Sequence, residues 1–187
     1  MRRTIADLRA RQKKDSTDLQ LRWNWNTPFF ISKHNPMTLY YGSNRVMKSI
    51  NRGASMSPIS PDLSYADTAK LRVALRTTGG ITPDVTGAET FGTVVSLNES
   101  PVRAGVLFAG TDDGRVWVTK NDGGTWEEVT KNIPGVAAGA YVSRVEGSYA
   151  SEGTFYVTFD DHRRDAAIAT ARGAAGHDEA GVLCGGA

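Results

Sequence analysis

The sequence contains little that would tie the chain to a membrane, a metal ion or nucleic acid. Its single cysteine, Cys184, excludes a disulfide within the chain. No apolar run approaches the roughly 18 residues of a membrane-spanning helix, and no signal peptide is visible at the start. Three histidines without ligand spacing argue against a metal site, and a net charge of +2 argues against nucleic acid as the main partner.

The sequence also lacks a recognisable set of catalytic residues. It has no phosphate-binding glycine loop and no combination of serine, histidine and aspartate at catalytic spacing. Its arginines are scattered, whereas a sialidase needs several that converge on a substrate carboxylate. We therefore expect no catalytic residue, no metal ion and no cofactor in this chain.

The most informative segment that is present is Thr-Lys-Asn-Asp-Gly-Gly-Thr-Trp at 119–126. It fits the pattern Ser/Thr-x-Asp/Asn-x-Gly-x-Ser/Thr-Trp of an Asp-box hairpin, which is typical of one blade of a β-propeller. The short polar side chains can accept backbone hydrogen bonds, and the glycines can take positive φ. Alternating residues on both sides predict paired strands near 115–120 and 125–130. The residues given a structural role in this turn are Thr119, Asn121, Asp122, Gly123, Thr125 and Trp126.

The same unit recurs along the chain, as a propeller requires. A shift of 70 positions places 45–56 on 115–126, with Arg, Val, Asn and Gly identical. The earlier copy is a degraded box, because arginine replaces Asp122 and alanine replaces Gly124. A third unit starts at Tyr141 and does not reach a box of its own. The structural residues of the first copy are Ser49, Asn51 and Gly53.

These units predict an all-β partial propeller of two to three blades, with a short N-terminal helix and a disordered tail. The predicted parts are a helix or linker at 1–20, the propeller at 21–165 and an Ala/Gly-rich tail at 166–187, for which we favour a frameshift as the origin. Within the propeller the repeat units cover about 23–60, 92–130 and 141–165, with an insertion at about 61–91 that includes a short helix at 65–76.

Two units and part of a third are too few to close a ring of about 4–8 blades. Three explanations are a fragment of a longer gene product, a partial propeller that self-assembles, and a sandwich-like relative. We favour the fragment, because open blade faces and strand edges promote aggregation.

Two tryptophans near the start of the propeller are spaced two residues apart. The alternation of 21–28 predicts a strand with Trp23 and Trp25 on one face. A pair of aromatic rings on one face could stack on a sugar, but burial in a blade core is the interpretation we favour.

Taken together, these motifs resemble a family of large bacterial sortilin-like proteins with BNR repeats, often labelled glycosyl hydrolases. The resemblance covers about 20–165 and implies that the chain is an interior slice of a larger, exported propeller protein. The motifs are Asn-Trp-Asn-Thr-Pro at 24–28, His-Asn-Pro at 34–36, Gly-Ser-Asn-Arg at 42–45, Ile-Ser-Pro-Asp-Leu at 59–63, Thr-Gly-Gly-Ile-Thr at 78–82, Ala-Gly-Thr-Asp-Asp-Gly at 109–114, the turn at 119–126, Tyr-Val-Ser-Arg at 141–144 and Phe-Asp-Asp-His-Arg at 159–163.

The candidates for ligand-facing loop residues fall at corresponding ends of equivalent strands. A glycosidase needs two carboxylates roughly 5–9.5 Å apart, but adjacent acids followed by Gly114 are more simply a hairpin turn. We favour a non-enzymatic scaffold that binds a protein, peptide or glycan. The alternative is a piece of a glycosyl hydrolase whose catalytic residues lie mostly outside this chain. The candidate residues are Asp112, Asp113, Asp160, Asp161 and His162.

Overall fold

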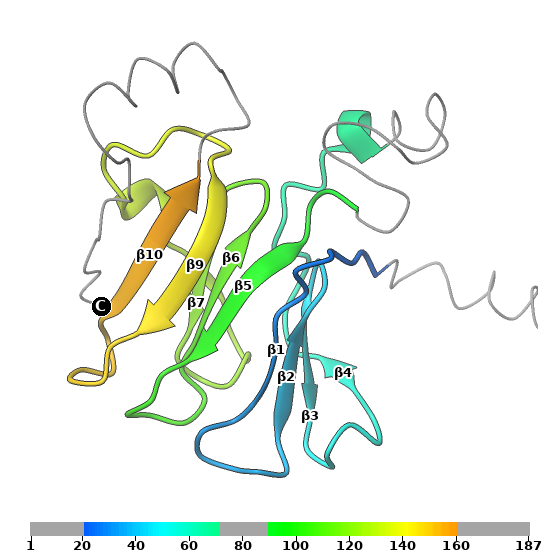
Figure 1. Cartoon of the computed structure of the whole chain (residues 1–187), viewed down its shortest axis with the longest axis vertical. Helices are drawn as coiled ribbons and strands as arrows, with labels where there is room; N and C mark the ends of the chain where they lie inside the picture. Colours follow the sequence, from blue (N-terminus) through cyan, green and yellow to red (C-terminus); the bar gives the residue numbers. More distant parts are fainter. Residues whose placement is uncertain (1–20, 72–89, 161–187) are drawn as a thin grey trace, which may run out of the picture.

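The computed structural model describes residues 21–71 and 90–160 (Figure 1). The predicted helix at 1–20, the tail at 166–187 and most of the insertion lie outside the described residues. Within the described ranges the chain forms ten strands in three antiparallel sheets, with a single 3-10 turn, η1, at Thr130–Asn132.

The first sheet contains four short strands in chain order. They are β1 (Phe29–Ile31), β2 (Leu39–Gly42), β3 (Val46–Ser49) and β4 (Ser57–Pro58), and each pairs antiparallel with the next. Aromatic and β-branched residues, which favour strands, supply most of the first three. We call this sheet the first blade.

The second sheet repeats the same arrangement and is called the second blade. Its strands are β5 (Val94–Glu99), β6 (Leu107–Thr111), β7 (Val116–Thr119) and β8 (Glu127–Glu128). Trp117 lies opposite Glu128 and Val118 opposite Glu127, so the hairpin predicted from the 119–126 turn is confirmed. The bounds of β7 and β8 are those of β3 and β4 moved by 70 positions.

The third sheet contains β9 (Tyr141–Gly147) and β10 (Phe155–Asp160), which also pair antiparallel. The inner strands β5 and β9 are linked across the gap between their sheets. Ser96 Oγ accepts the N–H of Val145 at 2.8 Å, and Asn98 Oδ1 accepts the N–H of Gly147 at 3.1 Å. The third sheet therefore occupies the place of the first hairpin of a further blade.

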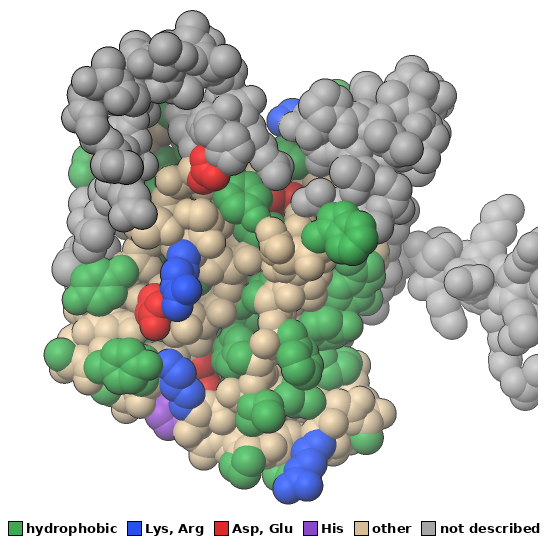
Figure 2. All heavy atoms as spheres, in the orientation of Figure 1, with side chains coloured by type: hydrophobic (Ala, Val, Ile, Leu, Met, Phe, Trp, Pro, Cys, Tyr) green, Lys and Arg blue, Asp and Glu red, His purple; other side chains and the backbone are tan. Residues whose placement is uncertain are grey.

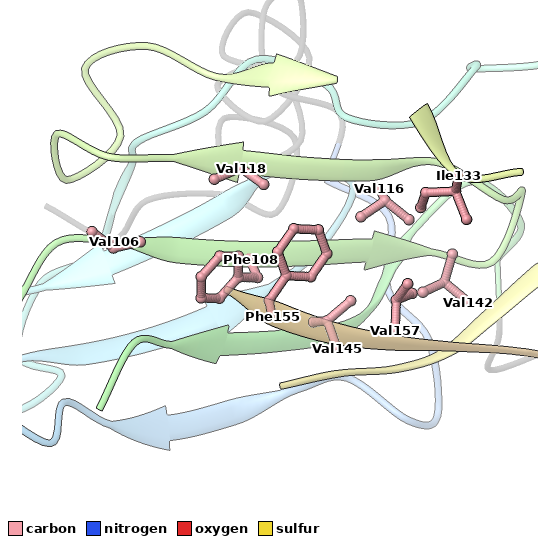
Figure 3. Close-up of a cluster of buried hydrophobic side chains, with 9 residues drawn as sticks. All are labelled: Val106, Phe108, Val116, Val118, Ile133, Val142, Val145, Phe155 and Val157. Atoms are coloured by element: carbon pink, nitrogen blue, oxygen red, sulfur yellow. The ribbon is translucent and has the colours of Figure 1, made fainter. Parts of the chain in front are cut away.

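Two apolar clusters hold the three sheets side by side (Figure 1). Burial of these side chains is the main favourable contribution to the stacking, at about 25 cal/mol for each Å² of apolar surface removed from water. The cluster between the first and second blades contains Tyr40, Val46, Leu63, Val94, Leu97, Leu107 and Ala109. The cluster between the second blade and the third sheet contains Val106, Phe108, Val116, Val118, Ile133, Val142, Val145, Phe155 and Val157, with Phe108 and Phe155 stacked at 4.9 Å between ring centroids (Figure 3).

Four-stranded antiparallel sheets connected in chain order and stacked face to face are the blades of a β-propeller. The predicted all-β partial propeller is therefore confirmed for the described residues, which supply two blades and the first hairpin of a third. Among the described residues no helix is long and apolar enough to cross a membrane.

The strand predicted at 21–28 is wrong. Thr27 N–H donates to Asn24 O at 3.1 Å and Asn26 N–H donates to Asn24 Oδ1 at 2.9 Å, so this segment turns. Trp23 packs beside Tyr41 at 5.1 Å between ring centroids, whereas Trp25 is 71% exposed and is no part of a blade core. The alternating pattern misled because Asn24 accepts hydrogen bonds from the residues that follow it, and these local bonds take the place of strand pairing.

The short helix predicted at 65–76 is described only in part. Residues 68–71 are helical, and Asp67 Oδ1 accepts the N–H groups of Ala69 and Lys70 at 2.9 and 3.2 Å. Asp67 therefore acts as the N-terminal cap.

Candidate functional site

The turn at 119–126 is held by two side chains that act as local acceptors. Thr119 Oγ1 accepts the N–H of Gly123 at 3.0 Å, and Asn121 Oδ1 accepts the N–H of Thr125 at 2.8 Å. Asn121 Nδ2 then donates to Thr125 Oγ1 at 3.0 Å. Asp122 and Gly123 take φ of 59° and 89°, which the tight reversal requires.

The turn after β3 repeats these bonds one by one, although several residues differ. Ser49 Oγ accepts the N–H of Gly53 at 2.8 Å, and Asn51 Oδ1 accepts the N–H of Ser55 at 2.9 Å. Arg52 and Gly53 take φ of 57° and 89°. The polar frame of the turn thus depends on the hydroxyl and the asparagine, not on the acid.

In the second blade the same turn also contacts the first blade. The hydroxyl of Tyr40 donates to Asp122 Oδ1 at 3.0 Å, and Lys48 forms an ion pair with the same carboxylate. Trp126 Nε1 donates to Ile59 O at 2.8 Å. A Cβ added to Gly123 would lie 2.5 Å from that same carbonyl, so the turn approaches the first blade as closely as glycine permits.

A buried glutamate closes this end of the interface between the blades. Glu99 is 1% exposed, and its carboxylate accepts the N–H groups of Lys33 at 3.1 Å and Gly105 at 3.3 Å. Burial, with the nearby charges of Glu99 and Asp122, raises the pKa of the Tyr40 hydroxyl well above its usual range. Tyr40 therefore stays protonated and acts as a hydrogen-bond donor between two acids.

The candidates Asp112 and Asp113 lie at the opposite end of the strands, in the turn between β6 and β7. Asp112 Oδ1 accepts the N–H groups of Gly92 and Thr93 at 3.0 and 2.8 Å, and its Oδ2 accepts Thr93 Oγ1–H at 3.1 Å. Asp113 Oδ2 accepts the N–H of Tyr65 at 2.7 Å. Both carboxyl groups are buried, and their contacts fasten the segment that leaves the first blade and the segment that enters the second.

The pKa values of these two acids are raised. Burial raises the pKa of Asp112 to about 7, the hydrogen bond from the Thr93 N–H opposes this effect, and the neighbouring charge of Asp113 adds to it. Burial also raises the pKa of Asp113, against the hydrogen bond from Thr111. An acid that is protonated near neutral pH can donate a proton, which is the property required of a general acid.

Two further acids, each paired with an arginine, complete this end of the interface. Arg22 Nη2 pairs with Asp62 Oδ2 at 2.8 Å, while Asn44 and Ser64 also donate to the Asp62 carboxylate. These hydrogen bonds and the charge of Arg22 outweigh burial and lower the pKa of Asp62. Arg115 pairs with Glu128 at 2.6 Å and lies between two aromatic rings, those of Tyr65 and Trp117, with its guanidinium carbon 4.7 and 4.4 Å from the ring centroids.

The remaining candidates are only partly described. Asp160 ends β10, at the same end of the strands as Asp112 and Asp113, because β10 and β6 run in the same direction (Figure 1). Asp161 and His162 lie outside the described residues. Within the ranges that the structure describes, no three His, Cys, Asp or Glu side chains come together in a way that could hold a metal ion.

Sequence reasoning missed Glu99, Tyr40 and Lys48 as interface residues. No signal was available for Glu99, because the burial of its strand is visible only in the structure. None was available for Lys48, whose partner Asp122 lies 74 positions away.

Comparison with known proteins finds GH74 enzymes among the solved structures that are similar to this chain, at low identity. No protein-family model and no curated protein matches the chain. It is similar to a GH74 xyloglucanase from Xanthomonas campestris (18% identity, TM-score 0.48), over 83% of this chain and 20% of that one. It is also similar to a GH74 enzyme of Niastella koreensis (17%, TM-score 0.43; 72% and 19% covered) and to an ancestral GH74 enzyme (16%, TM-score 0.44; 73% and 17% covered). The chain spans a fifth or less of the length of these structures.

Proposed function

We propose that this chain is a segment of a larger, exported β-propeller and serves as a non-enzymatic scaffold for binding a protein, peptide or glycan. The observation that supports a scaffold is that three acids at the strand ends are already hydrogen-bonded or ion-paired within the chain. Asp62, Asp112 and Asp113 are bound by backbone N–H groups, hydroxyls or an arginine of this same chain. Each of them therefore already has a structural task at the strand ends where a propeller usually binds its ligand.

The turns at 49–56 and 119–126 are, in this proposal, Asp boxes of the BNR type in a sortilin-like parent. Support comes from their matching hydrogen bonds and backbone angles, which are kept although Arg52 stands in the place of Asp122. A turn whose bonds are all local or directed to the neighbouring blade stabilises the propeller and has no part in chemistry. The rest of the propeller is then the first partner of this segment.

The alternative function is a fragment of a glycoside hydrolase. One observation favours it, namely that burial raises the pKa of Asp112 to about 7, as a general acid would need. Against it, both oxygens of that carboxyl group accept hydrogen bonds from Gly92 and Thr93, and the side chain is buried. A substrate would have to displace those donors before it could reach the proton.

Hydrolysis and binding can be separated with one polysaccharide. Xyloglucan is a suitable probe, because one of the similar structures is a xyloglucanase. New reducing ends would be measured after incubation with the chain and with the Asp112→Asn and Asp160→Asn variants, and binding would be followed by affinity electrophoresis in the same polysaccharide. We expect no reducing ends above the level of the variants. Hydrolysis by the native chain that is lost in either variant would overturn the scaffold and support the hydrolase.

A further inference from the structure

Two neighbouring aspartates in the turn between β6 and β7 hold two segments that lie far apart in the sequence. Asp113 Oδ2 accepts the N–H of Tyr65 at 2.7 Å, in the segment that leaves the first blade. Asp112 Oδ1 accepts the N–H groups of Gly92 and Thr93 at 3.0 and 2.8 Å, where the chain enters the second blade. We call these five residues the clamp. One turn thus joins the end of the first blade to the start of the second.

Gly92 is also held from its other side. Its carbonyl oxygen accepts the Nε–H of Arg22 at 3.1 Å and an Nη2–H at 2.9 Å, and Arg22 pairs with Asp62. Gly92 takes φ of 78°, and a Cβ added to it would lie 3.1 Å from Ser64 Oγ. Arginine is not deprotonated in proteins, and the pKa of Asp62 is lowered. The arginine side of Gly92 therefore keeps its charge across the neutral range, and only the aspartate side can change.

The charged groups beside the two aspartates are largely paired with one another. Burial is the largest cause of the raised pKa of both aspartates. The charge of Asp113 raises the pKa of Asp112 further. The charge of Arg115 lowers the pKa of Asp113, and that of Asp62 raises it. The charged and titratable side chains that the neighbouring segments bring to the clamp are Arg22, which pairs with Asp62, Arg115, which pairs with Glu128, Tyr65 over Arg115, and Lys70 over the ring of Phe91.

The closed clamp binds a proton that an open clamp would release. Asp112 is 6% exposed and Asp113 is 4% exposed, and acidic side chains occupy only small areas of the face that Figure 2 shows. A buried carboxylate is costly, so Asp112 ionises at about 7 in the closed clamp and near its ordinary pKa of 3.8 once water reaches it. The contribution of Asp112 to closure is therefore fully present below about pH 4 and is lost as the pH rises through about 7.

We propose that this clamp is a pH-sensitive switch, which holds Gly92 and Thr93 on the turn between β6 and β7 at acidic pH and releases them as the pH rises. The release is local, because neither apolar cluster includes a residue of the clamp. It loosens the strand ends at which a propeller usually binds its ligand. The switch goes beyond the proposed scaffold function and does not depend on it.

Amide hydrogen exchange of the full chain, measured residue by residue by NMR, tests the switch. After correction for the intrinsic rate at each pH, the protection of Gly92 and Thr93 is expected to fall about a hundredfold between about pH 5 and about pH 8. This factor follows from a pKa that is about 7 in the closed clamp and 3.8 in the open one. The amides of β6 are the internal reference. Gly92 and Thr93 should be less protected than these at every pH, because the clamp opens without the core.

Three variants separate the titration of Asp112 from other effects of pH. Asp112→Asn keeps an acceptor for both N–H groups but does not titrate, so the protection of Gly92 and Thr93 is expected not to change with pH. Thr93→Val removes the hydroxyl donor that lowers the pKa of Asp112, so the loss of protection should move to higher pH. Glu152→Gln removes an exposed acid that pairs with Arg103 at the other end of the strands, and this matched control should behave like the native chain.

Protection of Gly92 and Thr93 that stays constant with pH in the native chain overturns the proposal. So does an equal fall of protection in Asp112→Asn, or exchange at the rate of the β6 amides, which means that the chain opens only as a whole. If circular dichroism shows that Asp112→Asn is unfolded, Thr93→Val decides the question, and an unchanged midpoint in that variant overturns the proposal. These results do not involve a ligand and leave the proposed scaffold function standing.

Discussion

Positions 52 and 122 occupy the same place in two copies of one turn but carry opposite charges. Both residues take positive φ, at 57° and 59°, a conformation that costs a residue with a side chain about 1–2 kcal/mol. Asp122 offsets that cost through its contacts with Tyr40 and Lys48. Arg52 forms no ion pair with the residues that the structure describes. The acid of the turn is therefore a contact between blades and is not needed for the turn itself.

This difference predicts unequal effects of alanine at the two positions. Asp122→Ala is expected to lower the free energy of unfolding by about 1–2 kcal/mol, because the hydroxyl of the buried Tyr40 loses an acceptor. Arg52→Ala has the same backbone strain without such a partner and should change stability by less than about 0.5 kcal/mol. Urea denaturation of both variants checks the prediction. Equal losses of unfolding free energy in the two variants would show that the backbone strain of the turn, and not the contact of Asp122 with Tyr40, determines the effect of the substitution.

Asp112 makes stability depend on pH. Burial raises its pKa to about 7 from an ordinary value of 3.8, so between these values the folded state binds more protons than the unfolded state. Its contribution to stability is then fully present below about pH 4 and is lost as the pH rises through about 7. Relative to Asp112→Asn, the native chain is expected to lose up to about 4 kcal/mol between about pH 4 and pH 8. Parallel pH profiles of stability for the native chain and Asp112→Asn would show that Asp112 is not the source of the pH dependence.

The limits of sequence reasoning at this scale are set by the distance between partners along the chain. The acceptors that shape the turn lie within four residues of their donors, as in the bond from Gly123 to Thr119, so the local pattern contains them. Asp122 and Tyr40 are 82 positions apart, and only the stacking of the blades brings them together. For the same reason the burial of Asp112 could not be predicted from a turn sequence that reads as polar.

At the scale of elements, the tryptophan after the turn joins β8 to the blade before it. Trp126 packs against the cluster between the blades and donates to Ile59 O at 2.8 Å. The equivalent residue in the first copy is Met56, whose side chain has no N–H donor.

Trp126→Met therefore tests the role of the indole between the elements. It keeps an apolar side chain but removes the donor to Ile59 O, and we expect a loss of about 1–3 kcal/mol from packing and hydrogen bonding together. Met56→Leu, a change of similar size at the equivalent position, should cost less than about 1.5 kcal/mol. Thermal or urea unfolding gives both values. A loss in Trp126→Met no greater than that in Met56→Leu would show that the bond to Ile59 contributes nothing.

The two other tryptophans considered in the sequence show why element boundaries were harder to predict than blades. The segment from Trp23 to Pro28 alternates like a strand, yet Asn24 accepts three hydrogen bonds from Asn26 and Thr27 and bends the chain. Periodicity identified the strands whose partners are regular hairpins, such as β7 and β8. It failed where side chains of the same segment compete with strand pairing for the backbone.

At the scale of the whole molecule, the described residues form three sheets that share two separate apolar clusters, and no cluster of these residues is common to all three sheets. Each sheet therefore depends on its neighbour alone. The free energy of unfolding is expected to be the sum of the stabilities of the individual sheets and of the interfaces between them, as in repeat proteins. The sequence predicted this order of units from a motif and its spacing. It could not predict which interface is stronger, because that depends on how Phe108 and Phe155 meet across the gap between the second blade and the third sheet.

Phe155→Ala tests this independence of the sheets. The side chain is buried against Phe108, so its removal leaves a cavity that costs about 3–5 kcal/mol. If the sheets are coupled only through their interfaces, amide hydrogen exchange should accelerate in β9 and β10 while β2, β3 and β6 keep most of their protection. Leu97→Ala is the matched change in the other cluster and should loosen the first blade instead. An equal loss of protection in every strand of either variant would mean that the molecule opens as one unit, because the two clusters would then be energetically a single core.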